Sequence, residues 1–126
     1  MKHMKILLVD DDAFLRDMYA TKFKELKYVI DTAETAEIAL LKLENETFDV
    51  ILMDMIMPGM TGTELLKRIK SEKIGGDPIC IMLSNQSEGS DKTAALEAGA
   101  VGYIVKADYI PSDIVAEVQK IINNTK

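Results

Sequence analysis

The sequence predicts an α/β domain in which a five-stranded parallel sheet is doubly wound, with helices on both faces. Short apolar runs of strand length alternate with longer segments whose apolar residues recur at helical spacing, a pattern typical of parallel sheets with crossover helices. Residues 6–9 and 50–53 are apolar at every position, which indicates strands covered by helices on both faces. With 126 residues, 48% of them hydrophobic, the chain can bury such a core as one domain.

Each predicted strand is followed by a predicted helix. The strands are expected at residues 5–9, 28–33, 49–53, 78–83 and 102–105. The first helix begins near Ala13, and its apolar stripe is expected to include Leu15, Tyr19 and Leu26. The segment Thr61-Gly62-Thr63-Glu64 has the spacing of a capping box that begins the third helix, and Gly75-Gly76 is expected to end that helix. The later stripes comprise Ala36, Leu40 and Leu43; Leu65, Leu66 and Ile69; Ala94, Ala95 and Ala98; and Ile114, Val115, Val118, Ile121 and Ile122.

Net charge and cysteine content exclude several classes of protein. The chain has 15 Lys and Arg against 21 Asp and Glu, a formal net charge of −6, with no basic block. This balance disfavours direct binding of nucleic acid or anionic lipid. Cys80 is the only cysteine, so an intramolecular disulfide and an all-cysteine metal site are excluded, and a reducing compartment, the cytoplasm, is expected.

The N-terminal residues are set apart from the predicted domain. Residues 1–3 are expected to be an extension, and residues 4–126 the domain itself. His3, the only histidine, falls in the extension, so histidine-based metal binding or acid/base catalysis is not expected. No apolar run approaches the roughly 20 residues that span a membrane, and the N-terminus lacks the pattern of a signal peptide. The protein is therefore expected to be neither inserted into a membrane nor exported.

Acidic side chains follow two of the predicted strands. Asp10, Asp11 and Asp12 come directly after the first strand, and Asp54 comes directly after the third. Functional residues of doubly wound sheets gather beyond the carboxyl ends of the strands, so these carboxylates are expected at one edge. Carboxylates this close repel one another unless they are protonated, spread into solvent or held by a cation. Oxygen ligands without His or Cys favour a hard ion, and a few carboxylates with water suit Mg²⁺ better than Ca²⁺.

A structural explanation is also open for part of this cluster. Asp12 is predicted to cap the first helix, as an Asp before a helix commonly does. Asp10 and Asp11 taken alone could equally be solvated. The presence of Asp54 at the matching edge favours metal binding.

Asp54 is the best candidate nucleophile. A carboxylate held near a divalent cation can attack a phosphoryl group to form an aspartyl phosphate. Lys106, after the fifth strand, could place an ammonium on one phosphoryl oxygen, and the Ser84 hydroxyl, after the fourth, could donate a hydrogen bond to another. A single Ser or Lys at a strand end is more often just solvated, so this interpretation depends on their convergence.

The segment after Asp54 carries features with simpler explanations. Pro58-Gly59 predicts a turn, and Gly62 can admit a close approach of the backbone. Tyr103 is either a half-buried packing residue or one whose position reports on the site. The methionines of this region are interpreted as core and loop packing, not as a soft-metal site; they are Met53, Met55, Met57 and Met60.

Together these residues resemble the receiver domain of two-component response regulators and are similar to the single-domain chemotaxis receiver. The resemblance covers residues 4–124 and implies the flavodoxin-like strand order 2-1-3-4-5. Four motifs carry it in order: the acidic pair in Leu7-Leu8-Val9-Asp10-Asp11-Asp12, the segment from Asp54 to Gly62 with its Met57-Pro58, Ser84, and Ala98-Gly99-Ala100-Val101-Gly102-Tyr103-Ile104-Val105-Lys106.

The resemblance implies a role for each site residue. Asp54 would accept a phosphoryl group from a histidine kinase or a histidine phosphotransfer protein. The chain would catalyse only this phosphorylation of itself and the later dephosphorylation. Asp11, Asp54 and the backbone carbonyl of Ile56 would coordinate Mg²⁺, with Mn²⁺ as an expected substitute, and Asp10 would act mainly through a coordinated water. Ser84 and Lys106 would bind the phosphoryl oxygens.

The resemblance also implies a conformational switch. A shift of Ser84 coupled to Tyr103 turning inward would change the surface formed by the fourth helix, the fifth strand and the fifth helix. A downstream protein would bind that surface, and a homodimer linked to phosphorylation is a further possibility.

Three positions bear on how closely the site of this chain follows the pattern of the family. Ala107 stands where the family usually has proline after the lysine, often with a cis bond. Because a cis bond before a non-proline residue costs about 3 kcal/mol or more, we expect a trans Lys106–Ala107 bond and a locally changed loop. Ile56 and Gln86 occupy the positions two after Asp54 and Ser84, which influence hydrolysis in the family. Ile56 cannot orient water, so we expect a persistent phosphoryl group, with Gln86 the nearby side chain able to position the attacking water.

Other functions were weighed against this one. An aspartate-nucleophile phosphohydrolase would carry its acid/base Asp at the position of Ile56, and a flavodoxin-like cofactor binder would carry a phosphate loop where this chain has three acids. The alternative left open is a receiver-shaped interaction module that no longer depends on phosphorylation. The acids, Ser84 and Lys106 argue against it, and Ala107 is compatible with it.

Overall fold

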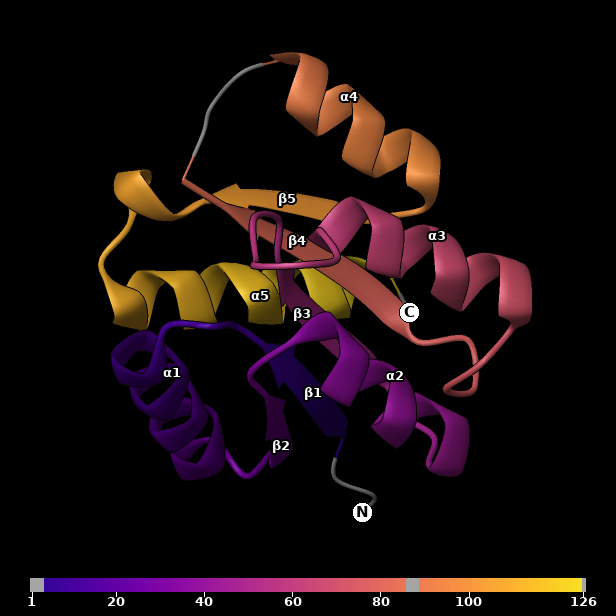
Figure 1. The fold of residues 1–126 in the computed structure, drawn as a ribbon. Helices are drawn as coiled ribbons and strands as arrows, with labels where there is room; N and C mark the ends of the chain where they lie inside the picture. The colour runs from indigo at the N-terminus through magenta and orange to yellow at the C-terminus, as the bar shows by residue number, and fades with distance from the viewer. Residues whose placement is uncertain (1–3, 86–88, 126) are drawn as a thin grey trace.

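The computed structural model describes residues 4–85 and 89–125, and strands and helices alternate along this part of the chain (Figure 1). A single 3₁₀ turn at Lys106–Asp108 joins the last strand to the last helix. The strands are β1 (Lys5–Val9), β2 (Val29–Ala33), β3 (Val50–Asp54), β4 (Ile79–Ser84) and β5 (Gly102–Val105). The helices are α1 (Ala13–Glu25), α2 (Ala36–Asn45), α3 (Gly62–Glu72), α4 (Gly89–Ala98) and α5 (Pro111–Thr125).

The strands form one parallel sheet in the order β2-β1-β3-β4-β5, which confirms the predicted fold class and strand order. Val9 lies opposite Met53 in the β1–β3 pair, and Asp54 lies opposite Leu83 in the β3–β4 pair. Each of these strands therefore ends within one residue of its neighbour in the sheet. Because every strand runs in the same direction, their carboxyl ends meet at one edge of the sheet.

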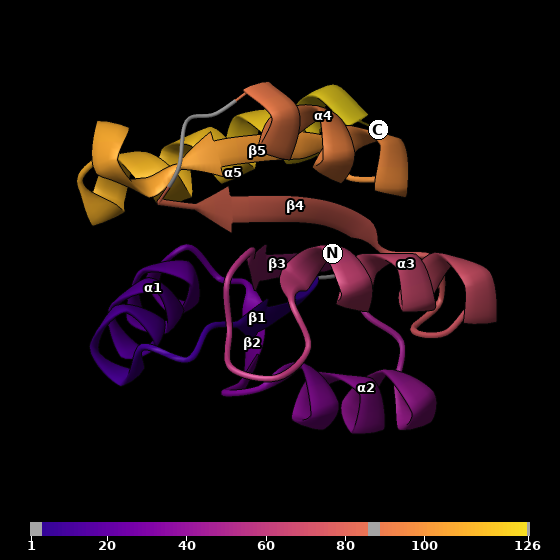
Figure 2. The same cartoon turned by 45° about the horizontal axis from the view of Figure 1, so that its top comes forward.

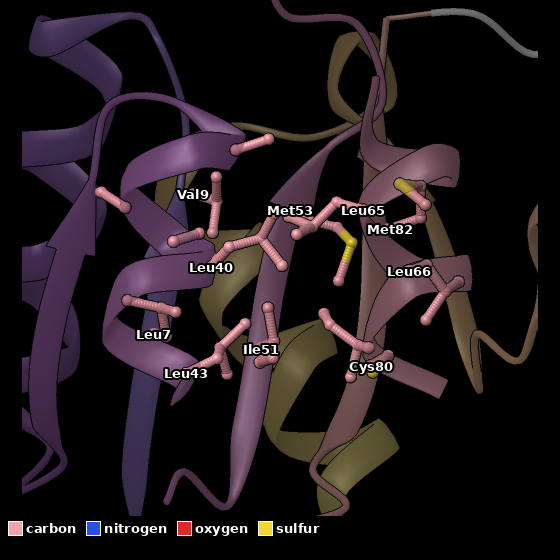
Figure 3. Close-up of a cluster of buried hydrophobic side chains, with 14 of the residues drawn as sticks. Leu7, Val9, Leu40, Leu43, Ile51, Met53, Leu65, Leu66, Cys80 and Met82 are labelled. Atoms are coloured by element: carbon pink, nitrogen blue, oxygen red, sulfur yellow. The ribbon is translucent and has the colours of Figure 1, made fainter. Parts of the chain in front are cut away.

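Helices cover both faces of this sheet (Figures 1 and 2). On one face, the buried side chains of α1 and α5, such as Phe23 and Val118, pack against Leu8 and Leu52. On the other face, side chains of α2 and α3 such as Leu40 and Leu65 point toward the strands (Figure 3). Alternate residues of each strand contribute to the two cores, which explains why the central strands are apolar throughout.

Side chains cap the beginnings of three helices, two of them as predicted. The Asp12 side chain accepts a hydrogen bond from the Leu15 N–H and caps α1. Thr61 and Glu64 form the complete capping box that begins α3, with each side chain bonded to the other residue's backbone N–H. Thr35, which the sequence analysis did not consider, caps α2 in the same way as Asp12 caps α1.

Some predicted boundaries are wrong. The helix α3 ends at Glu72, and Lys73, not a glycine, adopts the left-handed conformation at its C-cap with φ 53°. Gly75 and Gly76 lie in the following loop, where their φ values of 76° and 82° suit residues without a Cβ. Leu26 was expected on the buried stripe of α1 but follows the end of that helix and is exposed. The strands β3 and β4 include Asp54 and Ser84 as their last residues.

The helix α4 is held to the sheet by few side chains. Of its residues 91–98, Ala95 is fully buried, whereas Ala94, predicted to face the core, is exposed. Its neighbour Leu96 and Val101 in the following turn are also largely exposed. None of the helices in the described part of the chain is long and apolar enough to cross a membrane.

Candidate functional site

Four predicted site residues lie at the carboxyl edge of the sheet. Asp10 directly follows β1, Asp54 ends β3, Ser84 ends β4, and Lys106 directly follows β5. Because side chains alternate between the faces of a strand, Asp10, Asp54 and Lys106 continue the positions that face α1 and α5. Ser84 continues the positions that face α3 and α4. The strand alternation therefore places the charged groups and the hydroxyl on different faces of the same edge.

The acidic side chains converge as predicted. Ligand atoms of Asp10, Asp11 and Asp54 all lie within 4.8 Å of one another. The Lys106 ammonium lies 3.2 Å from Asp10 Oδ2 and 3.3 Å from Asp54 Oδ2, so one cation bridges two carboxylates that come from distant parts of the chain. Asp10, Asp54 and Lys106 are all buried, and Asp11 is exposed. Asp11 thus forms the open side of the cluster.

Asp10 is fixed through all of its polar groups. Its N–H donates to the Ala33 carbonyl at 3.1 Å, and its own carbonyl accepts from Arg16 Nη1 at 2.9 Å. Its Oδ1 accepts from the Asp12 N–H at 2.9 Å, while Oδ2 contacts Lys106. A carboxylate held on both oxygens is poorly placed to bind a cation directly. This geometry fits the expectation that Asp10 acts through a water.

The electrostatics of the cluster follow from burial and from the single bridging cation. Burial raises the pKa of Asp54 to about 6, because desolvation of the carboxylate outweighs the opposing attraction of Lys106. The pKa of Lys106 lies above its usual value, because Asp54 and Asp10 stabilise the ammonium more than burial destabilises it. Three carboxylates against one ammonium leave the site with excess negative charge.

The donor set fits a hard divalent cation. All three acidic groups offer oxygen, and the sulfur and nitrogen ligands that softer metals prefer are not among them. Mg²⁺ is commonly held by one or two carboxylates together with water, and the exposure of Asp11 leaves room for that water. The residues present therefore fit Mg²⁺.

The remaining predicted residues lie around this cluster. The Ser84 side chain is buried and Tyr103, on β5, is half-buried with its hydroxyl 3.8 Å from Met55 Sδ. The Ile56 side chain is 58% exposed beside the site, as a residue near an attacking water would be. Gln86 lies outside the described residues. No cis peptide bond occurs within residues 4–85 and 89–125, so the prediction of a trans Lys106–Ala107 bond is confirmed.

The sequence analysis missed Arg16 near the site and gave Met55 and Tyr19 a packing role only. Arg16 stabilises the acidic loop through the Asp10 carbonyl, and Met55 is an acceptor for Tyr103 and not merely core filling. Tyr19 was assigned to the core, which is correct, and burial raises the pKa of its hydroxyl although the Lys106 ammonium opposes that rise. The one sequence signal for the contact of Arg16 with the acidic loop was its position one turn into α1, because a side chain there can reach back over the preceding loop.

The fold and the site together define the class of protein. It has a doubly wound parallel sheet, and at the carboxyl ends of the strands lie an acidic cluster suited to a cation and a lysine that bridges two of the acids. The family model described as the response regulator receiver domain matches residues 6–119. The chain belongs to the response regulator receiver family.

Relatives and solved structures agree with this assignment. The chain is 36% identical over 118 residues to the transcriptional regulatory protein ResD of Bacillus subtilis, covering 94% of this chain and 48% of that protein. It is 34% identical over 120 residues to the phosphate regulon regulator PhoB of Pseudomonas aeruginosa, covering 95% and 52%. The chain therefore spans about half the length of these relatives.

Solved structures match this chain over nearly their full length. A CheY-like receiver domain protein from Methanospirillum hungatei has a TM-score of 0.86 at 30% identity, with 98% of this chain and 96% of that chain covered. Chemotaxis protein CheY4 of Vibrio cholerae has a TM-score of 0.86 at 29% identity, with 95% and 99% covered. The likeness extends over nearly every described element.

Proposed function

We propose that this chain is the phosphoacceptor domain of a two-component system and that Asp54 receives the phosphoryl group. The observation that carries the proposal is the placement of Asp54: a buried carboxylate at the end of β3, in reach of two further acids and 3.3 Å from the Lys106 ammonium. Phosphoryl transfer requires a nucleophile, oxygen ligands that hold a divalent cation, and a fixed positive charge, and these residues supply all three.

The reaction uses one carboxylate oxygen of Asp54. This oxygen attacks the phosphorus of a phosphohistidine, a P–O bond forms, and the P–N bond to the imidazole breaks with its electron pair remaining on nitrogen. Asp11, Asp54 and the Ile56 carbonyl would hold Mg²⁺, with Asp10 acting through water, and the ion would supply positive charge that stabilises the phosphoryl group. Hydrolysis by water later restores the free carboxylate.

Lys106 changes partners in this scheme. In the resting protein it neutralises Asp10 and Asp54. Once Asp54 is phosphorylated, its carboxylate charge is replaced by the charge of the phosphoryl group, and the Lys106 ammonium follows that charge to a phosphoryl oxygen. Ser84, buried at the end of β4, donates its hydroxyl to a second phosphoryl oxygen.

The output of the domain is a change of surface. Movement of Ser84 toward the phosphoryl group, coupled to Tyr103, alters the face made by α4, β5 and α5, which is weakly anchored at α4 and exposes Leu96 and Val101. The phosphodonor is a histidine kinase or a histidine phosphotransfer protein, and the α4–β5–α5 face binds a downstream protein or a second copy of the chain. Proteins, and not nucleic acid directly, are the partners of this domain.

A direct test is incubation with a small phosphodonor such as phosphoramidate in the presence of Mg²⁺, followed by intact-mass measurement. The wild-type chain should gain the mass of one phosphoryl group, and Asp54→Asn should gain none. Asp17→Asn, an exposed acid on α1, serves as the matched control and should still gain it. Reduction with borohydride should then locate the modified residue at position 54. Absence of added mass on the wild type, or equal addition to Asp54→Asn, would contradict the proposal and favour a module that works without phosphorylation.

A further inference from the structure

The side chains of Met55 and Tyr103 meet on the α3–α4 side of the sheet. Met55 belongs to the buried cluster on that face, and Tyr103 packs against the same cluster as a partly buried residue. The Tyr103 hydroxyl donates to Met55 Sδ across 3.8 Å, within the range of hydrogen bonds to sulfur. The two residues come from β5 and from the position after β3, so the contact spans β4, which lies between these strands (Figure 1).

Met55 is the fixed member of this pair. Its N–H donates to the Leu83 carbonyl at 2.8 Å, and its own carbonyl accepts from the Gly62 N–H at 2.9 Å. The residue is only 9% exposed, so its side chain has little room to move. Tyr103 lies on a strand at the edge of the sheet and is half-buried, so part of its side chain is exposed to solvent.

Met55 also adjoins the two residues that respond to a phosphoryl group. It follows Asp54 directly in the chain, and its N–H is bonded to Leu83, the residue before Ser84. The Tyr103 hydroxyl therefore contacts the side chain of the residue that directly follows Asp54 and is hydrogen-bonded to the residue before Ser84. A displacement of the backbone at Asp54 or Ser84 would carry Met55 with it and so change the position of the sulfur.

We infer that Met55 is a positioning residue for Tyr103, and that its sulfur sets the fraction of molecules in which the ring lies inward against the end of the sheet. This inference rests on the proposed function only in the role that it gives Tyr103 as the switch. A thioether is a weak acceptor, so the contact biases the ring toward the inward position without locking it there. The resting protein then holds Tyr103 partly inward before any phosphoryl group arrives.

The test replaces sulfur without changing side-chain volume. Met55→Leu keeps an apolar residue of similar size, a swap that costs less than about 1.5 kcal/mol, and removes the acceptor. Met57→Leu is the matched control, because Met57 is a buried methionine of the same cluster in the same loop. Met55→Ile is a second variant should Met55→Leu fold poorly.

The readout is fluorine NMR of protein labelled with 3-fluorotyrosine, in which the Tyr103 signal is identified by its loss in Tyr103→Phe. The solvent isotope shift between H₂O and D₂O reports how far the ring is exposed. We expect this shift for Tyr103 to rise at least twofold in Met55→Leu, with little change in Met57→Leu. The signals of Tyr19, Tyr28 and Tyr109 should stay in place in both variants, which a general loosening of the fold would not allow.

Two results would overturn the inference. One is an unchanged Tyr103 signal in Met55→Leu and Met55→Ile, and the other is an equal change in Met57→Leu. Because the measurement uses the resting protein, it is independent of phosphoryl uptake. A wild-type chain that gains no phosphoryl mass would refute the proposed function, whereas the contact between Met55 and Tyr103 would still be confirmed or refuted by the fluorine signal.

Discussion

A Cβ atom on residue 62 would overlap the carbonyl oxygen of Asp54, so Gly62 lets α3 begin in direct contact with the backbone of the proposed phosphoacceptor. The same atom would lie 2.9 Å from Met82 Sδ and 3.0 Å from Met55 Cα. The close approach expected from the sequence is therefore present, and its neighbours are mostly backbone atoms that cannot easily move. The backbone of Asp54 can keep its position only because residue 62 has no Cβ atom.

Gly62→Ala should lower the free energy of unfolding by about 1–3 kcal/mol, the usual cost of overpacking. This loss outweighs the gain of up to about 1 kcal/mol that alanine brings inside a helix. Urea unfolding measures the difference, with Lys67→Ala on the exposed side of the same helix as the control, expected within about 0.5 kcal/mol of wild type. A Gly62→Ala protein as stable as wild type would show that the backbone at Asp54 can yield.

Mg²⁺ should stabilise the folded chain, because the acidic cluster exists only after folding. At ten times its Kd the gain is about 1.4 kcal/mol, visible as a rise in Tm. Asp11→Asn should weaken Mg²⁺ binding at least about tenfold, since it removes a charged ligand at the exposed side of the site, equal to about 1.4 kcal/mol. Asp17→Asn should respond to Mg²⁺ as the wild type does, and an equal loss in both variants would argue against a specific site.

The raised pKa of Asp54 has a definite sign for stability. The folded protein holds a proton on Asp54 up to a pH of about 6, whereas the unfolded chain releases it near 3.8. Between these values the folded state binds more protons, so this group makes the protein less stable as the pH rises. In metal-free buffer, Asp54→Asn should therefore be more stable than wild type by about 1–2 kcal/mol at pH 7.5.

This difference should shrink as the pH falls, because a protonated Asp54 is as uncharged as asparagine. Urea unfolding in EDTA at pH 4.5, 5.5, 6.5 and 7.5 gives the profile. A stability difference independent of pH would mean that asparagine acts through packing and not through charge.

Ile56→Asn should shorten the lifetime of the phosphoryl group. The Ile56 side chain is largely exposed beside Asp54, and an amide in its place could hydrogen-bond the attacking water, whereas isoleucine cannot. An acceleration of about tenfold corresponds to a barrier lower by about 1.4 kcal/mol. The rate is measured as loss of phosphoryl mass in Mg²⁺ after removal of the donor. Ile56→Leu should hydrolyse at the wild-type rate, and an unchanged rate in Ile56→Asn would refute the hypothesis of a persistent phosphoryl group set by this position.

The sequence predicted the architecture well because the signals of the sheet are local. Val50–Asp54 is apolar until its last residue, and Asp12 and Thr61 cap their helices through contacts within three residues. The convergence of Asp10, Asp54 and Lys106 was also predictable, because the topology of a parallel sheet brings strand ends together regardless of the distance along the chain.

Other features depend on contacts that the sequence does not encode locally. Lys73 takes the left-handed position at the end of α3 although two glycines follow, because tertiary packing decides where the helix stops. Leu26 fits the apolar period but lies beyond the last turn of α1. The pairing of Tyr103 with Met55 depends on the rotamers of a side chain on β5 and of one just after β3, and periodicity carries no information about rotamers.

The division of the sheet edge into a charged side and a Tyr103 side has a consequence for how such a chain can diversify. Asp10, Asp54 and Lys106 continue the positions facing α1 and α5, while Ser84 and Tyr103 belong to the opposite face. Ser84 is the exception, because it lies on the Tyr103 side and is proposed to bind the phosphoryl group. Exposed positions such as Leu96 and Val101 can therefore vary with the downstream partner while Ser84 and the charged side stay the same.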